Sequence, residues 1–88
     1  MNQLKQHIVS TSTDGFELKY FKTVTQGEDD GVSFYGIFVE KHVNGSLAED
    51  AASGSISESN SQVCEIINKL AENSVTPFLL CEILDEII

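Results

Sequence analysis

Three residues near the middle of the chain have the side chains of a metal site. Glu40, His42 and Glu49 lie on either side of an Asn-Gly pair at 44–45. If that pair closes a two-residue hairpin loop, Glu40 falls opposite Glu49, and His42 shares their sheet face. Opposed like charges are unfavourable unless solvated or bridged by a cation, and carboxylates with an imidazole suit divalent transition ions. Because charges near strand ends usually extend into water, we interpret the three as weak metal candidates and expect no resident metal or cofactor.

Two other polar segments have simpler explanations. Residues 28–30 are three acids before a glycine, but the alternating ligands and distal Glu of a calcium loop are missing, so a solvated loop is expected. The serine-rich stretch 53–61 ends at an expected helix start, where an anion can bind but helix capping explains the serines. No nucleophile is placed beside His7 or His42, and no phosphate-binding glycine loop occurs. Enzymatic activity stays uncertain, and a non-catalytic role is favoured.

The charge of the chain limits its partners. Its 88 residues have a formal net charge of -9 at pH 7, with 14 acidic residues. Residues 49–88 hold most of the excess, because Lys69 is their only cation. We therefore expect no direct binding to nucleic acid or to a membrane surface, and we expect basic protein partners to be favoured. With no basic leader and no apolar run near the ~20 residues of a spanning helix, the expected location is cytoplasmic.

Two turn signals divide the first half of the chain into hairpins. Asp14-Gly15 and Asn44-Gly45 are typical two-residue hairpin loops between segments with strand character. We expect a single domain over residues 1–88 that begins with a four-stranded antiparallel β-meander. The predicted strands are residues 4–12, 16–24, 32–43 and 46–56.

Closed turns also predict which residues face one another. The expected pairs are Ile8 with Phe21, Val9 with Tyr20, Ile37 with Ala52, and Tyr35 with Gly54. Gly36 indicates a bulge or the close approach of another backbone. Residues 51–55 have poor strand propensity, so the fourth strand is expected to contain a bulge or an irregular edge.

The second half of the chain changes to helical periodicity. A helix over residues 59–72 is predicted from a Ser59-Gln62 capping pattern and from apolar residues at Val63, Ile66, Ile67 and Leu70. Thr76-Pro77 is typical of a second helix start, predicted to run over residues 77–87. The fold class is therefore α+β, with both helices packed on one sheet face. We interpret Cys64 and Cys81 as buried thiols and not as a disulfide.

Apolar side chains outnumber those that two short helices can cover. The third strand has apolar residues on both faces, and a single helical layer leaves one of these faces open. The terminal helix is apolar most of the way round, so it must be buried on more than one side, within the domain or against a second chain. The predicted interaction surface consists of Phe34, Phe38, Phe78, Leu79, Ile83 and Ile87.

Three motifs lie in the last two-thirds of the chain. They are Tyr35-Gly36-Ile37 in a central strand, Ile56-Ser57 before the helix with Val63, Ile66 and Leu70, and Val75-Thr76-Pro77 before an acidic terminal helix with Leu80, Glu82, Leu84 and Glu86. In these motifs the chain resembles a family of short uncharacterised bacterial proteins of the Firmicutes type. The resemblance implies no assigned activity, so it assigns no functional residue.

These observations support three functional hypotheses. The first is a small acidic protein–protein interaction or regulatory module that self-associates, with a homodimer as the expected assembly. The second is an acidic decoy that binds a basic nucleic-acid-binding protein, because residues 49–88 are strongly negative. The third is a small-molecule or metal-binding domain, with Glu40, His42 and Glu49 as its ligands.

Overall fold

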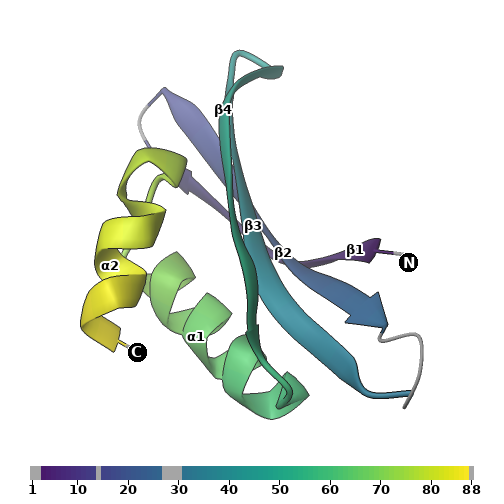
Figure 1. Cartoon of the computed structure of the whole chain (residues 1–88). Helices are drawn as coiled ribbons and strands as arrows, with labels where there is room; N and C mark the ends of the chain where they lie inside the picture. Colours follow the sequence, from purple (N-terminus) through teal and green to yellow (C-terminus); the bar gives the residue numbers. More distant parts are fainter. Residues whose placement is uncertain (1–2, 14, 27–30, 88) are drawn as a thin grey trace.

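The structure is a computed structural model that describes the backbone of residues 3–13, 15–26 and 31–87 and, within them, the side chains of residues 4–86. In this part of the chain, four strands form one antiparallel sheet in the order β1 (Gln3–Thr13), β2 (Phe16–Gln26), β3 (Ser33–Val43), β4 (Ser46–Ser57). They are followed by α1 (Asn60–Glu72), a 3-10 turn η1 (Pro77–Leu79) and α2 (Leu80–Ile87). Both helices lie on one side of the sheet (Figure 1). The predicted α+β meander with two C-terminal helices is confirmed.

The core lies between the sheet and the helices. Its largest fully buried side chains are Leu18, Tyr20, Ile37, Val39, Val63, Ile67, Leu70 and Leu80. Each of the aliphatic side chains contributes roughly 1.5–3 kcal/mol through burial. The hydroxyl of Tyr20 donates a hydrogen bond of 2.8 Å to the carbonyl of Val75, so it ties the segment between the helices to β2. Burial raises the pKa of Tyr20 to about 12.

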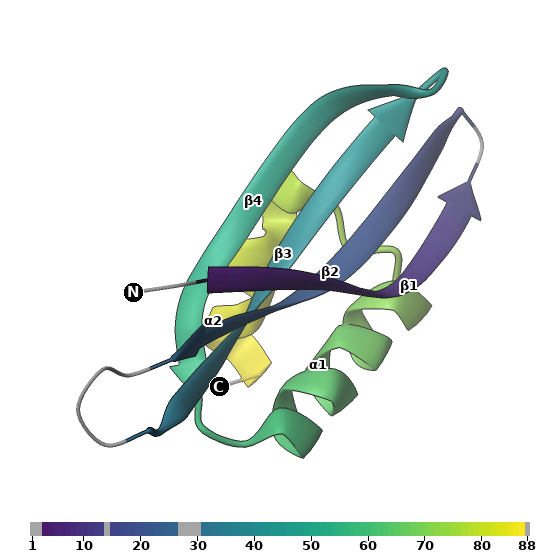
Figure 2. The ribbon, with the colours of Figure 1, turned by 90° about the vertical axis from the view of Figure 1, so that its right-hand side faces the viewer.

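A bulge at Ile8 bends β1. Val9 faces Tyr20 as predicted, but the register then shifts, so that His7 faces Phe21. The prediction that Ile8 faces Phe21 is wrong because the bulge adds one unpaired residue to β1. In Figure 2 the first half of β1 runs steeply across the other strands, on the side of the sheet away from the helices.

Bulges in β4 change the register predicted for the second hairpin. The register between β3 and β4 shifts at three places. Phe38, and not Ile37, therefore faces Ala52, and Tyr35 does not face Gly54. The expected irregularity of this strand is confirmed, but both predicted pairs are wrong, because a turn sets the register only as far as the first bulge.

Gly36 lies where the backbone of β4 approaches β3. A Cβ atom at this position would overlap the carbonyl oxygen of Gly54. Gly54 has a φ of +75°, in the left-handed region that favours glycine. The backbone N–H of Ile37 donates to the hydroxyl of Ser53 at 2.9 Å beside this bulge. The close backbone approach predicted at Gly36 is confirmed.

The two helix starts differ in their capping. Ser59 accepts a hydrogen bond of 3.2 Å from the backbone N–H of Gln62 and caps α1 as predicted. Thr76 makes no side-chain capping bond, and the chain first forms η1 before α2 begins at Leu80. The helix predicted over residues 77–87 is therefore α-helical only from Leu80. Among the described residues, every helix is too short or too polar to span a membrane.

Candidate functional site

The helix-free face of the sheet holds a cluster of aromatic and charged side chains. Because β1 is bent, the Nζ of Lys5 lies 4.1 Å from the ring centre of Phe38 and 5.1 Å from that of Phe21. These two rings meet edge to face at 5.9 Å, and His7 meets Phe21 in the same way at 5.5 Å. Phe38 is therefore partly covered by side chains of its own sheet.

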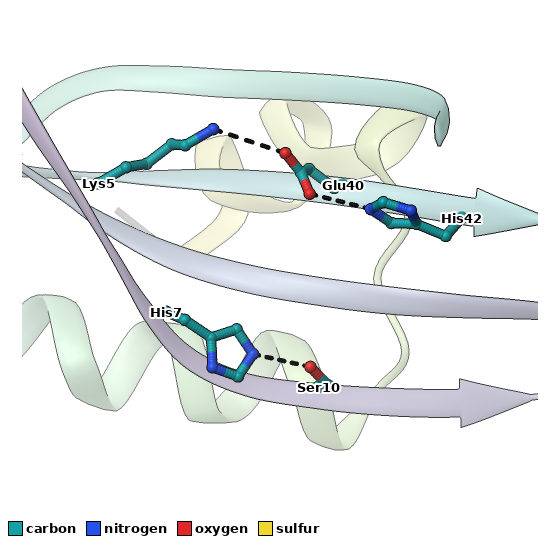
Figure 3. A network of polar contacts seen from close by, with 5 residues as sticks. All are labelled: Lys5, His7, Ser10, Glu40 and His42. Carbon is teal, nitrogen blue, oxygen red and sulfur yellow. Dashed lines mark hydrogen bonds and ion pairs between the residues drawn. The ribbon is translucent and has the colours of Figure 1, made fainter. Parts of the chain in front are cut away.

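Glu40 joins this cluster to His42. Its carboxylate lies 3.5 Å from the Nζ of Lys5 and 2.9 Å from the Nε2 of His42 (Figure 3). The hydrogen bond to His42, together with the charge of Lys5, holds the pKa of Glu40 below its ordinary value, although burial acts in the opposite direction. A second pair, His7 with Ser10 at 2.7 Å, lies apart on β1. A carboxylate can orient an imidazole for proton transfer, but no nucleophile bonds to His42 among the described residues.

The three weak metal candidates do not lie together. Glu49 faces Lys41 and forms an ion pair of 3.8 Å with it, and Asp50 takes the place opposite Glu40. The prediction that Glu40 faces Glu49 is therefore wrong. Since side chains alternate between the faces of a strand, Glu49 lies on the helix-covered side and His42 on the other. In the described ranges of the chain, no three His, Cys, Asp or Glu side chains are grouped to hold a metal ion.

Other polar segments singled out in the sequence give no catalytic group. The acids of residues 28–30 lie outside the described residues. In the serine-rich stretch, Ser59 caps α1, and Ser57 donates to the side chain of Gln62 at 2.7 Å. A polar pocket of about 460 Å³ lies between the two hairpin turns, and its lining residues are Ser12, Thr13, Gly15, Phe16, Glu17, His42, Asn44 and Gly45. The imidazole paired with Glu40 thus borders this pocket.

A second surface is formed by η1, α2 and the edge strand β4. Phe78 is 85% exposed and Leu79 is 38% exposed, whereas Ile83 packs partly against the core. The side chain of Ile87 lies outside the described ones. Between α2 and β4, a pocket of about 260 Å³ is lined by Ser53, Ile56, Cys81, Leu84 and Asp85. We call Phe78, Leu79 and the five pocket residues the α2–β4 surface.

The α2–β4 surface is bordered by acids and contains a thiol. Glu82 and Glu86 are exposed on α2, and Asp85 is part of the pocket wall. Cys81 is exposed and Cys64 is partly exposed, and both are free. The prediction of no disulfide is confirmed, but the prediction that both thiols are buried is wrong. Cys81 lies on a face of α2 that is turned away from the core, and Cys64 is only partly buried on α1. The result is a mainly apolar pocket with one acid, Asp85, in its wall and two further acids on the same helix.

Comparison with known proteins identifies a family. Residues 1–88 match the model of a family of unknown function (DUF6514). The chain belongs to this family. The match includes the N-terminal hairpin, which the resemblance seen in the sequence did not cover. No curated protein and no solved structure matches the chain. Family membership brings no activity with it, so the function has to be inferred from the surfaces of the molecule.

Sequence reasoning missed two lysines that organise this family member. Lys5 reaches Phe38 only because of the bulge at Ile8, and nothing in the local sequence indicates that bulge. Lys22 is 9% exposed, donates to the side chain of Asn60 at the start of α1, and lies 5.4 Å from the ring centre of Tyr35. A signal for Lys22 was present, because it occupies a core-facing position in the alternation of β2.

Proposed function

We propose that this protein is a protein–protein interaction module that binds its partner through the α2–β4 surface. The observation that carries the proposal is the 85% exposure of Phe78, at the start of a segment whose Leu80 is fully buried. Burying a side chain of this size contributes roughly 1.5–3 kcal/mol, and nothing in the described chain supplies that burial. A large exposed aromatic side chain beside an apolar pocket is typical of a binding surface.

The helix-free face of the sheet is the weaker candidate for this role. Phe38 is already contacted by Lys5, and Lys5 also pairs with Glu40. A partner that docked on Phe38 would have to displace these contacts first. Phe34 is 36% exposed, much less than Phe78. The α2–β4 surface therefore offers the more exposed aromatic side chain, and no charge contact to Phe78 from the described residues has to be displaced there.

A different protein is favoured over a second copy as the partner. A two-fold contact through α2 places the same residues of both copies near one another. Glu82, Asp85 and Glu86 would then face the same acids, and each copy carries a net charge of -9. Like charges across an interface oppose association. Self-association was expected because apolar side chains outnumber those that two helices can cover. The negative charge of this surface opposes it.

Site-specific photo-crosslinking tests the proposal. A photoreactive phenylalanine derivative replaces Phe78 in cells that naturally make the protein, and the matched control places it at Asn68, which is exposed on α1. We expect one discrete crosslinked product at position 78 and much less at position 68. A product of twice the monomer mass would show self-association and contradict a different partner. Equal or absent crosslinking at both positions would reject the interaction role.

A further inference from the structure

We infer that the α2–β4 surface accepts a basic amphipathic segment of the partner, whose apolar side chain enters the pocket while its Lys or Arg side chains lie against Asp85 and the other acids of α2. This inference rests on the proposed function and adds the chemistry of the partner to it.

The size of the pocket indicates a side chain as its occupant. Its volume of about 260 Å³ is smaller than the roughly 300–1,000 Å³ of small-molecule sites. Ile56 and Leu84 give it apolar walls, and Ser53 and Asp85 add polar groups. A single apolar side chain, presented by a chain that continues over Phe78, matches both the volume and the lining.

The arrangement of residues along η1 and α2 extends the contact beyond the pocket. Phe78, Cys81 and Asp85 are spaced three and four residues apart, so they lie along one side of this segment. Cys81 and Asp85 line the pocket, and Phe78 is next to them at the N-terminal end. An amphipathic segment can cover Phe78 and fill the pocket together, because both lie on the same stripe.

Charge determines which amphipathic segment fits. Asp85 is in the pocket wall, Glu82 is exposed four residues after Phe78, and the last turn of α2 has no basic residue. Cationic side chains of a partner find opposite charges here, whereas an acidic segment is repelled. The net charge of -9 also accelerates the encounter with a basic partner at low ionic strength.

Synthetic peptides test this chemistry directly. The probe is a peptide of Leu and Lys at helical spacing with one Trp, and its fluorescence reports binding because the protein has no Trp. One control peptide has the same composition in an order without an apolar face, and another has Glu in place of Lys. We expect the amphipathic basic peptide to bind at least tenfold more tightly than either control. Equal affinity for the scrambled basic peptide would mean binding by charge alone and would overturn the inference.

Protein variants locate the binding site. Phe78→Ser should weaken binding of the amphipathic basic peptide about tenfold, and this substitution does not threaten folding because Phe78 is exposed. Asp85→Asn should weaken binding and reduce its salt dependence, whereas Glu65→Gln on α1 should change little. Unchanged affinity in Phe78→Ser, or equal effects of Asp85→Asn and Glu65→Gln, would overturn the inference.

The thiols give an independent readout. Cys81 lines the pocket and is exposed, so bound peptide should slow its alkylation severalfold, while alkylation of Cys64 on α1 stays unchanged. Equal protection of both thiols, or of neither, would contradict the assigned site. The two proposals fail separately. A crosslink at position 78 without peptide selectivity would reject only the basic amphipathic partner. Selective peptide binding without a crosslink in cells would reject only the interaction role in the cell.

Discussion

The two faces of β3 are covered in different ways. On one face, Ile37 and Val39 have no exposed surface, because α1 and η1 pack against this side of the sheet. On the other face, Phe38 is covered by Lys5 and Phe21, and Phe34 stays 36% exposed. Large apolar burial therefore holds the helix-covered face, whereas the helix-free face depends on contacts worth about 0.5–1 kcal/mol each. Most of the folding free energy therefore comes from the helix-covered face, and substitutions on the helix-free face should lower the free energy of unfolding only slightly.

Truncating one residue on each face gives the largest expected contrast. Ile37→Ala should lower the free energy of unfolding by about 2–5 kcal/mol, because it leaves a cavity in the core. Phe34→Ala should lower it by only about 1–2 kcal/mol, because part of the ring already contacts water. Urea denaturation followed by circular dichroism measures both. Equal losses would mean that the two faces contribute alike.

Alkaline titration tests the burial of Tyr20, which lies on the helix-covered face. Its pKa is about 12 in the folded chain, above the ordinary value of 10.0, because burial disfavours the phenolate. Between pH 10 and pH 12 the unfolded chain has lost a proton that the folded chain keeps. The contribution of Tyr20 to the free energy of unfolding is therefore fully present below pH 10 and is lost as the pH rises toward 12. The total loss is roughly 2–3 kcal/mol. Denaturation midpoints across this range measure it. Tyr20→Phe should abolish this fall and Tyr35→Phe should keep it; a fall that persists in Tyr20→Phe would refute the assignment.

A methyl group at Gly36 should perturb the helix-free face through its backbone. Gly36 faces Thr23, and an added Cβ would meet the carbonyl of Gly54 and lie 2.8 Å from the hydroxyl of Thr23. Because a backbone carbonyl cannot rotate away as a side chain does, Gly36→Ala should cost about 1–3 kcal/mol. The matched control is Ala52→Ser, on an exposed position of β4. Wild-type stability in Gly36→Ala would show that β4 does not approach so closely.

Local signals were sufficient to predict the elements of this fold. The Asp14-Gly15 and Asn44-Gly45 turns predicted two hairpins, and the period of Val63 to Leu70 predicted α1. The pair Val9 with Tyr20 lies between the first turn and the first bulge, and it was predicted correctly. Such signals act over a few residues, so they can be recognised in a single sequence.

The candidate site was less predictable because it depends on bulges. One extra residue in β4 places Asp50 opposite Glu40, and it moves Glu49 to Lys41 on the other face. That single slip separates Glu49 from Glu40 and His42, which stay paired with each other. A bulge at Ile8 likewise brings Lys5 over Phe38. Poor strand propensity indicated that β4 is irregular, but the residue at which a strand slips is decided by sheet twist and tertiary packing, which the local sequence does not show.

The smallest expected effect concerns the contacts of Lys5. Lys5→Met keeps a side chain of similar length over Phe38 but removes the ion pair to Glu40, so it should cost about 0.5–1 kcal/mol. Amide hydrogen exchange near residues 5–7 should become faster, whereas exchange in β2 should not change. Lys41→Met is the control, because Lys41 pairs with Glu49 on the helix-covered side.

The dependence on pH separates the ion pair from simple packing. The pKa of Glu40 is lowered in the folded chain, so its stabilising contribution is present above its unfolded pKa and is lost as the pH falls through the folded value. The difference in stability between the wild type and Glu40→Gln should therefore shrink in acid. In a double-mutant cycle, Lys5→Met and Glu40→Gln should be non-additive at neutral pH. Strict additivity there would mean that the bend of β1, and not its charge contacts, holds the N-terminal half of the strand over the helix-free face.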